Sequence, residues 1–367
     1  MWTYRNPVRI HFGVDSFDSV ASLIGARDYL LVTYDENIFT DLGKRLAGQA
    51  GPAVQVINNI TPNPDFSSLR QSCAQMAAAK LMPEVIVAIG GGSVLDAAKV
   101  LCVGVNGFDA VAQYLESGGA SDTLPCNAVP LIAVPTTAGT GSEVTSWATV
   151  WDTEAAKKYS LARDDLYPTD AVVDPRLMVG MPRLLTVSTG LDALSHALES
   201  IWNVNANPVS TTYAIKAARL VLAHLPALAG DLGNLELRTH LAEAAAMAGL
   251  AFSNTKTALA HSLSYPITLH HGVPHGLACS LLLPSVMRSV IGASEVCDQA
   301  LGAIFGDDLA AGADRLEAFL RELDVATEFS AYGVTEAEWS RWVDEAMDGE
   351  RGRNFIGPQN QVQEVFF

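Results

Sequence analysis

The first half of the chain alternates short apolar runs with stretches that have helical spacing. Continuous apolar runs bounded by turn residues are typical of strands buried on both faces of a parallel sheet. Because helices separate them here, the pattern predicts an α/β domain with a Rossmann-like, doubly wound parallel sheet. The predicted strands lie at residues 29–34, 53–57, 84–90, 128–137 and 171–175.

The second half has a different pattern. Long Ala- and Leu-rich segments, such as 211–230 and 237–252, place apolar residues at helical spacing. This pattern predicts an all-helical domain, in which strands play no part. We therefore expect two domains, the α/β domain over residues 1–182 and the helical domain over residues 183–367.

Charge and cysteine content limit the partners and the compartment. Acidic residues outnumber basic ones by 40 to 23, so the net charge of −17 disfavours binding to nucleic acid or to an anionic membrane. An anionic substrate would need a local cationic pocket. The five cysteines are scattered without CxxC spacing, and the N-terminus lacks a signal-peptide pattern, so we expect a cytoplasmic protein.

Three glycines follow one predicted strand and precede a predicted amphipathic helix. In VIVAIGGGSVLDAAKV, Gly91, Gly92 and Ser93 stand at the start of that helix. Glycine allows a pyrophosphate to approach the backbone, and the helix N-terminus stabilises its negative charge. The loop predicts a dinucleotide site, although a plain strand-to-helix turn has similar residues and the spacing is not GxGxxG.

A hydroxyl-rich segment, PTTAGTGSEVTSWATV at 135–150, follows the next predicted strand. By itself this segment fits ordinary turn chemistry as well as it fits a cofactor loop. The two loops together favour a nucleotide cofactor.

The second half carries candidate metal ligands. Asp192 and His196 lie four residues apart in a helical pattern and so project from one face, which fits either a metal site or a surface hydrogen bond. Several imidazoles with a carboxylate suit Fe²⁺ or Zn²⁺ and argue against Mg²⁺ or Ca²⁺. Half of the eight histidines fall within a short stretch that ends in a PHG turn: His261, His270, His271 and His275.

Four motifs in this order, GGGS, PTTAGTGSE, GLDALSHALE and the PHG turn, resemble the iron-containing (group III) alcohol dehydrogenase family. The resemblance runs from about residue 7 to beyond residue 290. It implies a dehydroquinate synthase-like fold, a homodimer, and hydride transfer between NAD(P)H and a small aldehyde or alcohol, with Fe²⁺ or alternatively Zn²⁺. The implied metal ligands are Asp192, His196, His261 and His275, with His271 as a competitor of His275. The implied cofactor-binding residues are Asn63, Gly91, Gly92, Ser93, Thr136, Thr140, Thr145 and Lys158.

Two positions depart from the family pattern. Many relatives carry a second His four residues after the third ligand, where this chain has Tyr265, so either Tyr265 or His271 takes the proton-handling role. NAD-preferring relatives place an Asp directly after the VT of the first strand, where this chain has Tyr34 followed by Asp35. A carboxylate there bonds the ribose 2′-hydroxyl and repels a 2′-phosphate, so we expect NAD, with NADP open.

Lys256 lies on the run that leads into His261. The TKT and AHSLSYP context resembles the phosphonoacetaldehyde reductase branch, and Arg351 and Arg353 in the tail offer further positive charge. We therefore expect an anionic aldehyde such as phosphonoacetaldehyde, with a plain surface lysine as the alternative.

Three other functions fit part of the pattern. A metal-dependent hydrolase would use the same ligands to activate water but would leave the glycine loop unexplained. A lyase or cyclase of the dehydroquinate synthase type shares the two-domain plan and uses NAD only transiently. A non-catalytic binding protein has no need of the clustered ligands.

Overall fold

The computed structural model describes residues 1–78, 82–125, 127–155, 157–358 and 362. It divides into two compact units. The sheet unit comprises Pro7–Thr137 and Ser142–Met178, and the helical unit comprises Met1–Asn6, Ala138–Gly141 and Val179–Phe367.

This division differs from two contiguous domains that meet at residue 182. The N-terminal residues join the helical unit because Tyr4 Oη donates to the carbonyl of Leu250 (3.1 Å) and the Arg5 amide donates to Asn254 Oδ1 (2.9 Å). The segment Ala138–Gly141 joins it because its glycines lie against helices of that unit. Hydrophobic periodicity contains no information about such contacts.

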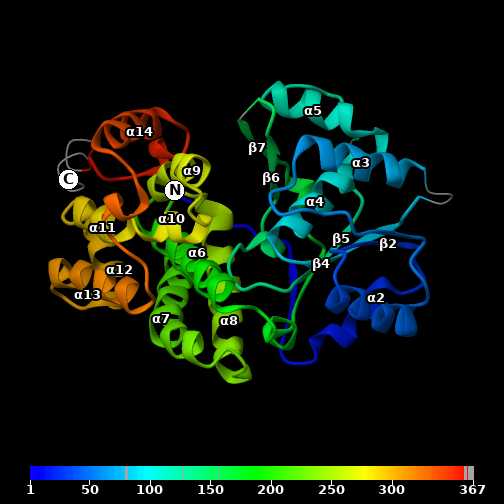
Figure 1. Cartoon of the computed structure of the whole chain (residues 1–367), viewed down its shortest axis with the longest axis horizontal. Coiled ribbons are helices and arrows are strands. Elements are labelled where there is room, and N and C mark those ends of the chain that lie inside the picture. Colours follow the sequence, from blue (N-terminus) through cyan, green and yellow to red (C-terminus); the bar gives the residue numbers. More distant parts are fainter. Residues whose placement is uncertain (79–81, 126, 156, 359–361, 363–367) are drawn as a thin grey trace. The chain divides into compact units, whose positions relative to one another are not determined.

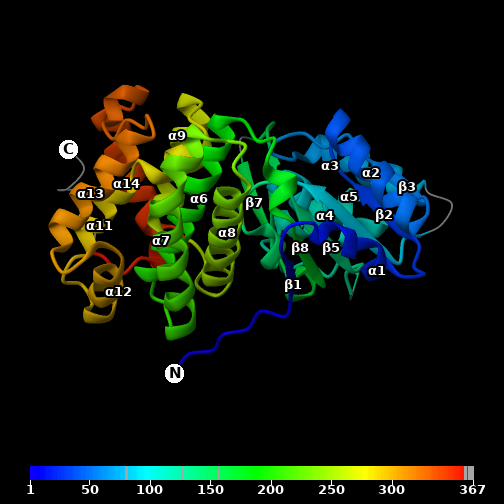
Figure 2. The same ribbon diagram turned by 90° about the horizontal axis from the view of Figure 1, so that it is seen from below.

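The sheet unit contains a parallel sheet with the strand order β1-β8-β5-β4-β2-β3 (Figure 1 and Figure 2). Its strands are β1 (Arg9–Phe12), β2 (Tyr29–Val32), β3 (Gln55–Ile57), β4 (Val85–Gly90), β5 (Leu131–Pro135) and β8 (Asp170–Val173). A separate antiparallel hairpin consists of β6 (Trp147–Asp152) and β7 (Lys157–Ala162).

Alternate residues of each central strand enter two different cores, as the two-residue repeat of a strand requires. Leu30 and Val32 pack on one face of the sheet, whereas Tyr29 and Leu31 pack on the other. The predicted doubly wound arrangement is therefore confirmed. The helices of this unit are α1 (Val20–Ile24), α2 (Asn37–Ala50), α3 (Phe66–Ala77), α4 (Gly92–Val103) and α5 (Phe108–Glu116).

Three local predictions differ from the structure. Strand β1 was missed because it lies at a sheet edge, is short, and leaves Ile10 and Phe12 exposed. The hairpin begins inside the hydroxyl-rich segment, for which the sequence pattern predicts a loop. Helix α4 is not amphipathic, because even Lys99 is fully buried within it.

The strand order contains a switch point that bears on function. The chain passes from β2 outward to β3 and then returns to the other side of β2 to form β4. The connections that leave β2 and β4 therefore diverge at their carboxyl ends. Open parallel sheets bind ligands at such a point, so the residues that follow these two strands are candidates for a nucleotide site.

The helical unit is built on three long helices, α6 (Arg183–Ile201), α7 (Pro208–Gly230) and α8 (Leu235–Thr255), which pack side by side (Figure 1). Asn207 caps α7 by accepting from two amides, and Pro208 fits the first turn because it lacks an N–H. The remaining helices are α9 (Leu259–His271), α10 (His275–Ser280), α11 (Leu283–Val290), α12 (Glu295–Phe305), α13 (Leu309–Glu322) and α14 (Glu336–Asp348). Within the described residues no helix has the length and apolarity needed to cross a membrane.

Candidate metal centre and nucleotide site

One face of α6 carries three buried polar side chains. Asp192, His196 and Glu199 are separated by four and three residues, so they follow one another along the same side of the helix. Each is at most 6% exposed. Burial of so many polar groups is costly unless they have partners, so this face needs an explanation.

Helices α9 and α10 bring His261 and His275 to that face. Asp192 Oδ1 lies 3.5 Å from Nε2 of His261 and 3.9 Å from Nε2 of both His275 and His196. The imidazoles also contact one another, with the rings of His196 and His261 stacked at 4.5 Å. The structure thus brings all four sequence-predicted ligands together around one carboxylate oxygen.

The donor atoms fit a divalent ion. Asp192 Oδ1 and His261 Nε2 are inaccessible and have no hydrogen-bond partner, an arrangement that native proteins avoid unless a ligand completes it. Two atoms bound tetrahedrally at about 2.1 Å to one ion lie about 3.4 Å apart, close to the separations seen here. Oxygen and imidazole donors are the set that Fe²⁺ and Zn²⁺ accept.

The electrostatics agree with this fit. Burial alone would raise the pKa of Asp192, but the adjacent imidazoles outweigh it and hold that pKa below its usual range, so the carboxylate is ionised. Burial lowers the pKa of His196 to about 4, which leaves its imidazole neutral. An ionised carboxylate and a neutral imidazole are the forms that bind a metal. Burial alone would lower the pKa of His261, but its contacts with Cys279, Glu199 and Asp192 outweigh burial and raise that pKa, so an ion bound there would displace a proton from His261.

Glu199 is a functional candidate that the sequence reasoning missed. It is fully buried, and its carboxylate contacts Nδ1 of His261 at 2.6 Å while accepting from the backbone amides of Ala258 and His261. The carboxylate thereby directs Nε2 of His261 toward Asp192. Its spacing from His196 on the predicted helix was the available signal.

Glu199→Gln is expected to weaken metal binding by about 10- to 100-fold, because an amide orients His261 less strongly than a carboxylate does. Chelator competition would measure the affinity. Activity should return at saturating metal, since Glu199 acts through His261. A variant with unchanged affinity would contradict this positioning role.

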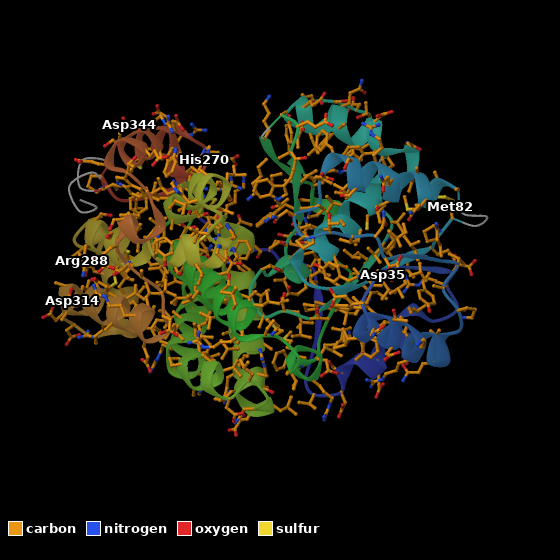
Figure 3. All side chains as sticks on the ribbon, in the orientation of Figure 1. Asp35, Met82, His270, Arg288, Asp314 and Asp344 are labelled. Carbon is orange, nitrogen blue, oxygen red and sulfur yellow. The ribbon has the colours of Figure 1, made fainter. Side chains whose placement is uncertain are left out.

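The sequence-predicted catalytic residues separate into two locations. The ring of Tyr265 stacks on that of His275 (5.7 Å, 5°), so this residue adjoins the ligand cluster. His271 follows His261 by ten residues on α9, about 15 Å along the axis, and instead contacts Trp342 and Glu338 of α14. Figure 3 labels the neighbouring His270, which stacks on the same Trp342.

The structure gives the three candidate cations different surroundings. The ammonium of Lys256 pairs with Glu350 at 2.8 Å, and its side chain is 59% exposed. Arg353 donates to the carbonyl of Asp348. Only Arg351 is linked to the ligand cluster by a described contact, because its guanidinium lies 5.0 Å from the centre of the Tyr265 ring.

Several predicted cofactor residues follow β2, β3 and β4. Asp35, labelled in Figure 3, is exposed and accepts from Asn58 at 2.9 Å. Asn63, in the left-handed region at φ 56°, donates its amide to Ser93 Oγ at 3.2 Å. Gly91 caps α4, and Gly92 is its first residue. Gly92 and Ser93 are partly exposed, and a helix N-terminus of this kind binds a phosphate well.

The other predicted cofactor residues differ in exposure and place. Thr136 is 7% exposed after β5, and Lys158 lies over the Trp151 ring in the hairpin. Thr140 belongs to the helical unit. Thr145 is 1% exposed, and its hydroxyl accepts from the buried ammonium of Lys99 at 3.2 Å.

Lys99 is a second group that sequence reasoning missed. Its ammonium also donates to Ser142 Oγ (2.9 Å) and to the carbonyl of Trp147 (2.7 Å), so it joins α4 to the hydroxyl-rich segment. Burial lowers the pKa of Lys99 to about 8. The signal was a lysine within the apolar run that follows the glycine loop.

Comparison with known proteins gives two matching family models. Iron-containing alcohol dehydrogenase matches residues 7–175, and the C-terminal model of the Fe-containing alcohol dehydrogenase family matches residues 186–366. The chain is 36% identical over 66% of its length to 1-propanol dehydrogenase PduQ of Salmonella typhimurium, and the match spans 61% of that relative. It is 32% identical to the NAD-dependent methanol dehydrogenase of Bacillus methanolicus, over 86% of this chain and 84% of the relative.

A solved structure is also similar over the whole chain. The sulfoacetaldehyde reductase of Bifidobacterium kashiwanohense, in complex with NAD⁺, has a TM-score of 0.91 and 30% identity, with 100% of this chain and 98% of that one covered.

The fold and the two sites define a nucleotide-linked oxidoreductase with a metal centre. The chain belongs to the iron-containing alcohol dehydrogenase family. The hydrolase and the dehydroquinate synthase type of lyase are not favoured, because these relatives are dehydrogenases and reductases.

Proposed function

We propose that the chain reduces a small aldehyde with a nicotinamide nucleotide, or oxidises the corresponding alcohol, at a metal ion held by Asp192, His196, His261 and His275. The observation that supports it is the convergence of three Nε2 atoms on Asp192 Oδ1 at 3.5–3.9 Å. When bound, the ion polarises the substrate oxygen and the nicotinamide carries the hydride.

The residues of the chain then have distinct tasks. Glu199 orients His261, and the switch point of the sheet holds the nucleotide through the N-terminus of α4. Tyr265, stacked on His275, is our candidate for proton handling at the substrate oxygen. No nucleophilic side chain is required for hydride transfer.

The test is a screen of aldehydes and alcohols with NADH and NADPH after anaerobic reconstitution with Fe²⁺ or Zn²⁺. We expect net, metal-dependent oxidation of the nucleotide by an aldehyde. Product formation without any nucleotide change would support a hydrolase instead. Transient reduction of NAD⁺ without net NADH would support the lyase.

We expect NAD to be preferred, because Asp35 follows β2 at the switch point of the sheet and is held there by Asn58. Asp35→Ser should raise the ratio of kcat/KM with NADP to that with NAD by about tenfold, since a 2′-phosphate would no longer face a carboxylate. The matched control is Glu36→Gln, which removes the same charge one residue along. If both changes had the same effect, the cofactor preference would depend on the negative charge of this region in general and not on the Asp35 carboxylate.

We further propose that the aldehyde carries an anionic group such as a phosphonate or sulfonate. Arg351 supports this because its guanidinium adjoins Tyr265, which stacks on His275. The Arg351 Nε also donates to Thr257 Oγ1 at 3.1 Å, which holds the side chain in place. The structurally similar reductase from Bifidobacterium kashiwanohense is named for an aldehyde with a sulfonate group.

Kinetics with phosphonoacetaldehyde and with propanal separate this proposal from the general function. Arg351→Gln should lower kcat/KM for the anionic aldehyde by about tenfold to a hundredfold and leave propanal unchanged, because a charge-assisted contact is lost. Arg353→Gln is the matched control, and Lys256→Ala tests the lysine that the sequence suggested. If propanal and phosphonoacetaldehyde were turned over equally well, the proposed dehydrogenase activity would stand, but the anion pocket would be excluded.

A homodimer in the cytosol completes the proposal. Strand β1 forms an edge of the described sheet, and its outer residues Ile10 and Phe12 are exposed. An exposed edge strand presents backbone groups on which a strand of another chain can pair. Sedimentation equilibrium would measure the oligomeric state, and a monomer at micromolar concentration would contradict the homodimer.

A further inference from the structure

Cys279 lies among the proposed metal ligands although no sequence motif pointed to it. It is fully buried on α10, one turn after His275. Its Sγ is 3.7 Å from Nε2 of His275. One ligand atom each from Asp192, His261, His275 and Cys279 lies within 4.8 Å of all the others.

This group is tighter than the one that the family resemblance implies. His196 approaches Asp192 but is not part of the set whose atoms are all mutually close. His196 instead lies between two rings, parallel to Phe252 at 4.0 Å and to His261 at 4.5 Å. The sulfur therefore has at least as good a position for coordination as the imidazole of His196.

A second observation shows that a ligand belongs in this group. Asp192 Oδ1 and His261 Nε2 are inaccessible and have no hydrogen-bond partner. Both atoms belong to residues of the set that includes the sulfur. By contrast, Cys297 on α12 is also buried, at 3% exposed, but belongs to no such group within the described residues.

We propose that Cys279 Sγ is a ligand of the same ion as Asp192, His261 and His275, so that the centre contains sulfur. On binding, the thiol loses its proton to solvent and the sulfur donates an electron pair to the ion. A soft thiolate beside imidazole and carboxylate favours Zn²⁺ over harder ions. This inference rests on the proposed metal centre and adds a donor to it.

X-ray absorption of the protein loaded with one equivalent of Zn²⁺, without nucleotide or substrate, tests the proposal. We expect a sulfur shell at about 2.3 Å in addition to nitrogen and oxygen at about 2.0–2.1 Å. Cys279→Ser should lose the sulfur shell, whereas the matched control Cys297→Ser should keep it. In the cobalt-loaded protein, the thiolate-to-metal charge-transfer band should be absent from Cys279→Ser and present in Cys297→Ser.

The wild-type spectrum alone can overturn the proposal, whether or not the variants fold. One bound zinc with only nitrogen and oxygen neighbours would exclude Cys279 and leave the metal centre intact. Failure to bind zinc, cobalt or iron at all would refute both the sulfur ligand and the proposed metal centre. A sulfur shell that persists in Cys279→Ser would also refute the assignment of Cys279 as the sulfur ligand.

Discussion

Replacing Asp192 by Asn is expected to abolish stoichiometric metal binding and to lower kcat/KM by about a thousandfold or more, which corresponds to about 4 kcal/mol. Asp192 Oδ1 is the atom on which all three imidazoles converge, and it is ionised because the imidazoles lower its pKa. A neutral amide of the same size keeps the shape and removes the anionic ligand. Metal analysis and steady-state kinetics would measure both effects.

The control for that change is Asp324→Asn in the same unit. Asp324 is exposed, pairs with Arg183 and has φ 63°, a conformation that Asn accepts readily. This variant should keep its metal and its activity, because a surface ion pair contributes little. Full metal content and activity in Asp192→Asn would exclude the proposed ligand role.

Gly276→Ala is expected to destabilise the helical unit by about 3 kcal/mol through overpacking and to weaken metal binding. A Cβ on Gly276 would lie 1.9 Å from the backbone carbonyl oxygen of Ser188, so α10 would have to move away from α6. That movement separates His275 from Asp192. Urea denaturation and chelator competition would measure the two losses.

At Gly302 the same substitution is expected to have the opposite effect on stability. Gly302 lies inside α12, and a Cβ there meets no atom within 4 Å. Alanine should stabilise this helix by up to about 1 kcal/mol. Equal stability of Gly276→Ala and Gly302→Ala would contradict the conclusion that α10 packs too closely against α6 to admit a Cβ at residue 276.

Local pattern predicted much of the fold. Central strands such as Leu131–Pro135 were recognisable because burial on both faces makes them continuously apolar. The edge strand Arg9–Phe12 was not, because half of its neighbours are absent and its residues remain polar or exposed. Charged residues can also be buried when other groups pair with them, which is why Lys99 contradicted the predicted amphipathic helix.

The candidate site shows the same division. The four-residue spacing of Asp192 and His196 determined that they share a face, because the helical repeat alone decides it. The same repeat put Tyr265 beside the cluster and His271 far from it, but only once α9 was known to continue through Pro266. A proline usually breaks a helix, so the sequence left both residues open.

By itself, the sequence determined the class of fold, the glycine loop after a strand, and the residue types of the candidate metal ligands, because these depend on neighbours along the chain. Only the tertiary structure decided that Glu199 contacts His261, that Cys279 lies among the candidate ligands, and that Lys256 pairs with Glu350. These contacts join separate elements of the chain. Their geometry depends on how helices pack, which no local repeat specifies.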